Sequence, residues 1–338
     1  MPLSSLFARV GAALFGGSSE ADDVDAALLD ECVDAIVKAV DPRLKLMPRY
    51  RSRLAPATIC SIRFLRSLAP RLPDPIELSR DAWSADPYVN AFFATPNDVQ
   101  TCLDRNVELG AFFRDPSNAQ LDAAYGVLGM RREERNVLAS ALVEGEVRRD
   151  VAQTTVGFTT HTLFGMARDI GTTRGLLGEA ILERVAGLAL ERIVAVRDRA
   201  VELETRKSML ATRLRMLTLR RGNLQSLAAG EQDPSAEIAA LQRELETTAE
   251  DHLELKTDLA TLDHSFAQVE AVLGEPARHL GMDTIELRVS HTGYKVDAAS
   301  PETAAALRLN ELWIGSNLHA VIVPVCVPRS ALSSAASG

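Results

Sequence analysis

The chain has 338 residues, of which 46% are hydrophobic and only 5% aromatic, so it is apolar enough to fold and favours helices over an all-β architecture. Its 46 acidic residues outnumber the 37 basic ones, giving a net charge of −9, which excludes a generally basic nucleic-acid-binding protein as the first interpretation.

Residues 1–19 are predicted to form a separate amphipathic segment. One face of a short helix would carry the apolar residues Leu3, Leu6, Phe7, Val10 and Leu14. This segment either packs on the body of the protein or lies on a membrane surface. No stretch reaches the roughly 20 apolar residues of a spanning helix, so we expect no membrane span.

Residues 20–174 are predicted to form a helical domain. An acidic amphipathic helix ends at Asp41-Pro42, because the residue before a proline leaves the helical region. Farther along, Thr95 before Pro96 has the chemistry of a helix N-cap. The Thr-rich stretch 154–173 fits a strand or a helix, since its periodicity does not distinguish them.

Within this domain, segment 42–73 contains eight basic residues and no acidic one. Clustered arginines bind phosphates of nucleic acid or anionic lipid. The candidate anion- or partner-binding residues are Arg49, Arg51, Arg53, Arg63 and Arg66. The alternative is that they pair with acidic helices of the same chain, above all the one at 20–41. Few aromatic residues are interleaved, so nucleic acid is less favoured than an acidic partner or a lipid surface.

Residues 175–274 carry the clearest pattern, two long helices whose apolar residues recur at alternating steps of three and four. We predict an antiparallel coiled-coil hairpin with its turn near 229–234. The residue numbers of facing positions then add to 462, which pairs Leu203 with Leu259. Gly171 to Gly175 is interpreted as a break before the first helix. The predicted seam consists of Val196, Leu203, Leu210, Leu217, Leu224, Ile238, Leu245, His252, Leu259 and Phe266.

Residues 275–329 are predicted to form a small α+β domain, and residues 330–338 a disordered tail. Residues 283–290 alternate like a strand, Ser300-Pro301 opens a short helix, and Pro324 places a later strand at a sheet edge. The predicted fold class is therefore mainly α: an N-terminal helical domain, a long antiparallel coiled-coil hairpin and a small C-terminal α+β cap.

Sequence motifs of catalysis are absent. The chain has no phosphate-binding loop, no HExxH and no GxSxG, and its four cysteines form no CxxC pair. We therefore predict no catalytic residue, no metal site and no cofactor. His161, in the Thr-rich stretch, has the least evident structural role of the six histidines.

The leading functional hypothesis is a non-enzymatic interaction or scaffold protein that binds a protein partner or itself. Its expected location is the cytoplasm, with residues 1–16 and 42–71 as candidates for contact with the inner membrane surface. One alternative is a nucleic-acid-associated protein that uses the arginines of 42–73. The other is an enzyme with an unrecognised site in the N-terminal helical domain, near His161.

Overall fold

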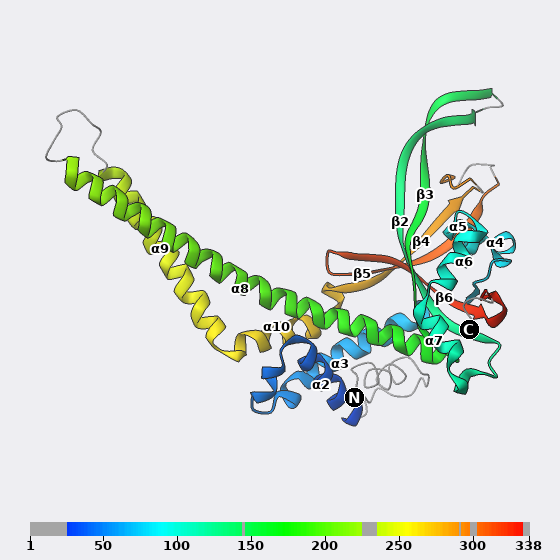
Figure 1. Ribbon diagram of the computed structural model, residues 1–338, viewed down its shortest axis with the longest axis horizontal. Helices are drawn as coiled ribbons and strands as arrows, with labels where there is room; N and C mark the ends of the chain where they lie inside the picture. The colour runs from blue at the N-terminus through cyan, green and yellow to red at the C-terminus, as the bar shows by residue number, and fades with distance from the viewer. Residues whose placement is uncertain (1–25, 144–145, 225–234, 291, 298–302, 334–338) are drawn as a thin grey trace.

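A computed structural model describes residues 26–143, 146–224, 235–290, 292–297 and 303–333 (Figure 1). A body of helices and a sheet carries two long projections, which diverge from a common base (Figure 1). We call them the helical arm, α8 (Ile170–Leu224) with α9 (Ser235–Ala260), and the hairpin arm, β2 (Ala123–Val143) with β3 (Glu146–Ala167). The predicted N-terminal segment 1–19 and the turn near 229–234 lie outside the described residues, as does the tail beyond residue 333.

Two helices open the described chain, α2 (Ala26–Val40) and α3 (Tyr50–Leu68). As predicted, α2 ends before Asp41-Pro42, and the Asp41 carboxylate accepts a hydrogen bond from the Arg43 N–H. Leu65 of helix α3 is completely buried, and α3 packs against α2 and α10 (Leu262–Gly274). Short 3₁₀ turns connect several elements: η1 (Pro42–Leu46), η2 (Ala69–Arg71), η3 (Pro116–Asn118), η4 (Pro276–Arg278) and η5 (Arg329–Ala331).

Four short helices follow: α4 (Ala82–Ala85), α5 (Pro87–Phe92), α6 (Pro96–Asp104) and α7 (Val107–Arg114). Thr95 is the N-cap of α6, as predicted, and forms a capping box with Asp98. These helices pack against one face of the sheet, where Phe92, Leu103 and Leu109 share a core with apolar strand residues.

All six described strands belong to one sheet: β1 (Ile76–Glu77), β2 (Ala123–Val143), β3 (Glu146–Ala167), β4 (Leu280–Val289), β5 (Ala305–Ile314) and β6 (Leu318–Pro328). The order is β3-β2-β6-β5-β4 with antiparallel neighbours, and β1 pairs in parallel with β6. The segment after β4 returns to β3, where Lys295 N–H donates to the Thr154 carbonyl at 2.8 Å. The sheet therefore curls back on itself.

The predicted fold class is wrong, because the sheet is large and takes strands from both ends of the chain. Residues 123–167, assigned to the helical domain, form its two longest strands, so the C-terminal strands are no separate cap. The helix expected after Ser300-Pro301 is also wrong, since β5 covers 305–314. Pro324 does not mark an edge, because β6 lies between β2 and β5.

Helices cover both faces of this sheet. One core joins α2, α3, α8 and α10 to sheet residues such as Met282 and Ile314. The other lies under α4 to α7 and includes Leu128 and Val323. Because both faces are covered, Gly126 to Met130 are buried in succession, and β2 lacks the polar–apolar alternation that would have revealed a strand.

The helical arm consists of α8 (Ile170–Leu224) and α9 (Ser235–Ala260), and α10 (Leu262–Gly274) returns to the body. The break predicted at Gly171 to Gly175 is wrong, because Asp169 accepts the Thr172 N–H at 2.8 Å and starts the helix ahead of both glycines. From 193 to 220, α8 has only these buried or half-buried residues: Ile193, Val196, Ala200, Leu203, Lys207, Leu210, Leu214 and Leu217. Four of them, Val196, Leu203, Leu210 and Leu217, belong to the predicted seam, and the other four alternate with them along the same face.

Ion pairs across the arm determine how α9 is aligned on α8. His252 lies 3.2 Å from Glu204, Arg206 pairs with Glu244 at 2.6 Å, and Arg213 pairs with Glu237 at 2.7 Å. If facing numbers added to 462, Arg206 and Glu244 would be about 18 Å apart along the helix axis, too far for their side chains to meet. The residue numbers of these pairs add to 456, 450 and 450, all below 462, so the predicted register is wrong. Because His252 contacts Glu204, the neighbour of Leu203, Leu203 lies nearer to His252 than to Leu259.

Candidate binding cleft at the base of the arms

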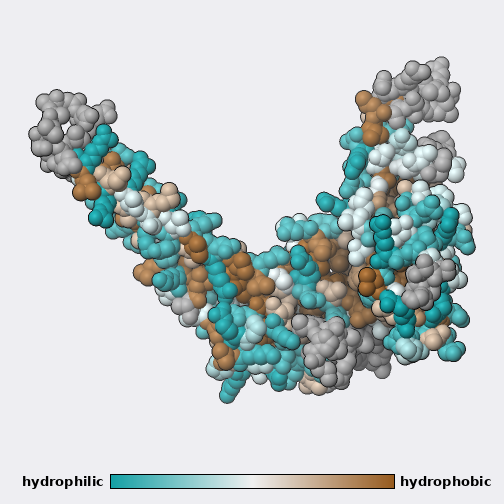
Figure 2. All heavy atoms as spheres, in the orientation of Figure 1, coloured by the Kyte–Doolittle hydropathy of each residue, from teal (hydrophilic) through white to brown (hydrophobic). Residues whose placement is uncertain are grey.

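A cleft of about 630 Å³ lies where α8 leaves the body, between that helix, strands β2 and β3, and the β5–β6 turn. Figure 2 shows hydrophobic residues gathered at the base between the two arms. From α8, Leu177, Ile181 and Arg184 reach the cleft because they recur at steps of four and three on one helix face. The opposite wall carries Phe164 of β3 and Leu318 of β6.

The floor of the cleft is apolar and its rim is basic. Leu177 and Ile181 are buried at the floor, whereas the side chains of Arg131 and Arg184 line the cleft from opposite elements. Arg184 pairs with Glu191 at 3.4 Å, and its buried Nε has no hydrogen-bond partner among the described residues. Such a cleft suits a ligand that has both apolar groups and carboxylate or phosphate oxygens.

A β-bulge shapes the β3 side of the cleft. The pairing of β2 with β3 shifts between Gly129 and Arg131, where Thr160 and His161 are the extra residues opposite Met130. Thr160 has the left-handed backbone conformation, with φ of 55°. Bulges redirect side chains in this way next to binding sites.

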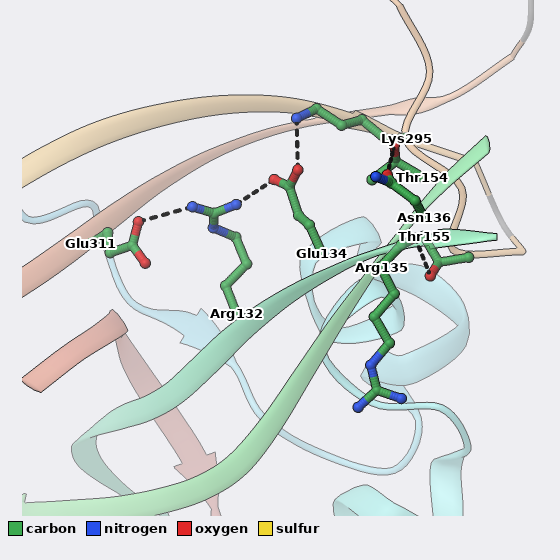
Figure 3. Close-up of polar contacts among 8 residues, drawn as sticks. All are labelled: Arg132, Glu134, Arg135, Asn136, Thr154, Thr155, Lys295 and Glu311. Atoms are coloured by element: carbon green, nitrogen blue, oxygen red, sulfur yellow. Dashed lines mark hydrogen bonds and ion pairs between the residues drawn. The ribbon is translucent and has the colours of Figure 1, made fainter. Parts of the chain in front are cut away.

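Polar contacts fix the root of the hairpin arm beside the cleft (Figure 3). Arg132 bridges Glu134 on its own strand and Glu311 of β5, the latter at 3.1 Å. Glu134 also accepts from Lys295, at 3.0 Å, after β4. Because Arg132 directly follows Arg131, this network holds the β2 wall of the cleft against the rest of the sheet.

A second cavity, of about 610 Å³, is lined in part by His161. The alternative functional prediction is an enzyme with its active site near this histidine. The imidazole Nε2 lies 2.8 Å from the Phe92 carbonyl oxygen and the ring stacks on Phe93, with centroids 4.3 Å apart. Burial lowers the pKa of His161 and raises the pKa of the Cys102 thiol. The described residues that line this cavity therefore include no activated thiolate, and His161 is engaged in packing.

The five arginines predicted to bind anions do not converge on one site. Arg51 pairs with Asp34 of α2 at 2.7 Å, and Arg53 contacts Asp263 at 3.4 Å while it covers the ring of Phe266. The others lie along α3, where Arg49 and Arg63 are exposed and Arg66 is half-buried. The apolar stripe of this helix belongs to the core, so Ile62, Leu65 and Leu68 are unavailable to a membrane.

Arg131 and Arg184 were not singled out by the sequence analysis. They are 53 positions apart and come together only because α8 packs on the sheet. The spacing of neighbouring residues in the sequence does not reveal such a long-range contact.

The helices described for this chain include none whose length and apolarity would let it cross a membrane. Across the described ranges, no three His, Cys, Asp or Glu side chains gather as a metal site requires. Comparison with protein-family models, curated proteins and solved structures finds no match.

Proposed function

We propose that this chain is a non-enzymatic interaction protein that holds an acidic, partly apolar segment of a partner protein in the cleft at the base of its arms. The observation that carries the proposal is the combination of a buried apolar floor with Arg131 and Arg184 at the rim. Burial of apolar side chains would supply affinity, and the guanidinium groups would select carboxylates by charge-assisted hydrogen bonds.

A polypeptide fits this cleft better than a small molecule because the surface continues along α8. Ala180, Arg184, Glu191 and Val194 fall on one face of the helix, which leads from the cleft onto the arm. A partner segment longer than the cleft would therefore find further contacts on the arm. Because the chain has a net charge of −9, its surface as a whole would repel an acidic segment. Such a segment would therefore need the local positive charge of Arg131 and Arg184.

We retain the cytoplasm as the proposed location. Cys32, Cys60, Cys102 and Cys326 are all unpaired, which favours a reducing compartment. We do not carry membrane contact through 42–71 into the proposal, because α3 turns its apolar stripe to the core.

Fluorescence anisotropy with a labelled amphipathic peptide of Leu, Ala and Glu tests the proposal. We expect the variant with Arg131→Ala and Arg184→Ala to bind this probe roughly tenfold more weakly, a loss of about 1.4 kcal/mol. Arg135→Ala is the matched control, because Arg135 is exposed on the same hairpin arm and pairs only locally, with Glu133 at 2.7 Å.

The same titration with Gln in place of every Glu of the probe separates charge from apolar contact. The proposal predicts weaker binding of this neutral peptide to the wild-type protein. Equal affinity for both probes, or an unchanged affinity of the double variant for the acidic probe, would overturn the proposal. So would the absence of binding of the acidic probe at about 100 µM protein, which is the order of the dissociation constant of a weak complex.

A further inference from the structure

The helical arm has a second apolar stripe, on the face of α8 that points away from α9. Most of the large exposed hydrophobic side chains of the described chain lie on it: Val194, Val201, Met209, Met216 and Leu219, which are 41, 66, 68, 66 and 60% exposed. At 3.6 residues per turn, this stripe is centred almost opposite the face that packs on α9. Contiguous exposed apolar surface of this kind marks an interaction site.

Two threonines make the stripe less polar than its sequence suggests. Thr205 and Thr212 lie between the apolar residues on the same face. Each hydroxyl donates a hydrogen bond to a carbonyl of its own helix, Val201 for Thr205 and Ser208 for Thr212, both at 2.9 Å. With their hydroxyls occupied in this way, the side chains offer methyl groups to a partner.

The spacing of the stripe reads the same in both directions from its centre. From Val194 to Met216, its positions are Val194, Asp198, Val201, Thr205, Met209, Thr212 and Met216, and Leu219 lies one step beyond them. The steps between them are four, three, four, four, three and four. A surface that binds a copy of itself about a twofold axis must be self-complementary in this sense, since residue i contacts residue j and j contacts i.

We propose that this stripe binds the same stripe of a second copy of the chain, antiparallel, with Thr205 on the twofold axis. Val201 then faces Met209 of the second copy, and Val194 faces Met216. The contact runs over 23 residues, about 33 Å of helix from the first to the last. It does not depend on the proposed function, because neither Arg131 nor Arg184 takes part, although the second copy would occupy Glu191 and Val194, where the surface of the cleft continues along α8.

The charges beside the stripe favour the antiparallel direction. From residue 205 to 221, α8 contains six basic residues and no acidic one, whereas its exposed acidic residues lie nearer the body. Glu191 and Glu202 share one flank of the stripe with Arg213 and Arg220. In the antiparallel pair, Glu191 meets Arg220 of the second copy, while Arg213 keeps its partner Glu237 on α9. A parallel pair would set arginines against arginines.

The body leaves room for this pairing. The tip of the second copy would pass α8 near residue 186. On that side of the helix, Glu183 and Glu191 are exposed, whereas Gly187 and Leu190 are half-buried, so the face is partly covered there. The stripe itself is exposed at every position from Val194 to Met216.

Sedimentation velocity of the full chain tests the proposal by its oligomeric state. We expect a dimer at micromolar concentration for the wild type. The variant with Val201→Glu and Met209→Glu should be monomeric with unchanged helix content, because it places four carboxylates at the contact. Val107→Glu is the matched control, since Val107 is 79% exposed on α7, away from the stripe, and this variant should remain a dimer.

Cysteine cross-linking in a Cys60→Ser background tests the register. Thr205→Cys should form a disulfide-linked dimer with itself, whereas Val201→Cys should cross-link only when mixed with Met209→Cys. At a protein concentration of about 100 µM, every dimer except a very weak one is populated. A wild-type chain that stays monomeric at this concentration would overturn the proposal, and the stripe would then be a surface for another protein. Self-linking of Val201→Cys without that of Thr205→Cys would also overturn it.

Discussion

Glu204 and His252 lie 3.2 Å apart across the helical arm, Oε2 to Nδ1. This contact brings His252 beside Leu203, the neighbour of Glu204, rather than Leu259. In the resulting arm, α9 covers one apolar face of α8 and leaves the other to solvent. The covered face stabilises the arm within one chain, and the exposed face remains accessible to a partner.

A pair of engineered cysteines reports this alignment directly. In a Cys60→Ser background, Leu203→Cys with His252→Cys should oxidise to an intramolecular disulfide, because His252 contacts Glu204, the neighbour of Leu203. Leu203→Cys with Leu259→Cys is the control, one heptad away, and should keep two free thiols. Mass spectrometry of the alkylated protein counts the thiols. Preferential closure of the second pair would contradict the alignment.

The free energy of unfolding should depend on pH through Glu179 of α8. Burial, and then the charge of Glu183, raises the pKa of Glu179 from 4.5 to about 7, and its buried Oε2 has no described hydrogen-bond partner. Because the folded pKa lies above the unfolded one, the ionised carboxylate costs stability. That cost is absent below pH 4.5, grows as the pH rises toward 7 and is complete above it.

Glu179→Gln removes this cost. We expect urea denaturation at pH 8 to show a gain of roughly 1 to 3 kcal/mol over the wild type, and little difference at pH 4.5. Glu183→Gln, which removes only the neighbouring charge, should give a smaller gain at pH 8. Equal effects of Glu179→Gln at both pH values would refute this role of the carboxyl group.

The root of the hairpin arm should depend on Arg132 more than on Arg135. The Arg132 side chain is 21% exposed and its partner Glu311 is 17% exposed, so Arg132→Ala leaves a half-buried carboxylate without its cation. We expect a loss of about 1 to 3 kcal/mol in urea denaturation. Arg135 is 74% exposed, and Arg135→Ala should change stability by less than about 0.5 kcal/mol. Similar losses for the two variants would contradict the difference.

The helical arm could be predicted from sequence, but its register could not. Alternating steps of three and four persist along both helices, and only a packed face maintains them over that length. A shift of seven residues preserves every apolar layer, so the heptads alone fit 462 and any register shifted from it by whole heptads equally well. The register is instead indicated by polar contacts, such as the ion pair of Arg206 with Glu244. The apolar pattern of the sequence does not predict these contacts.

The sheet was missed for a different physical reason. Strand β2 is covered on both faces near Leu128, so it lacks alternation, and the charged run from Arg131 to Arg135 does not resemble a strand. That run is accommodated because Arg132 and Glu134 find partners on distant elements. The candidate cleft depends on the same long-range packing, which brings Arg131 to Arg184.

Methionine oxidation tests the central claim most directly, namely that α8 keeps an apolar face free within one chain and covers it with a second copy. With dilute peroxide and mass spectrometry, Met209 and Met216 should oxidise rapidly at nanomolar protein and slowly at micromolar protein. Met130 and Met282, which are buried in the body, should be protected at both concentrations. Protection of Met209 and Met216 at nanomolar protein, or equal oxidation rates at the two concentrations, would contradict the account.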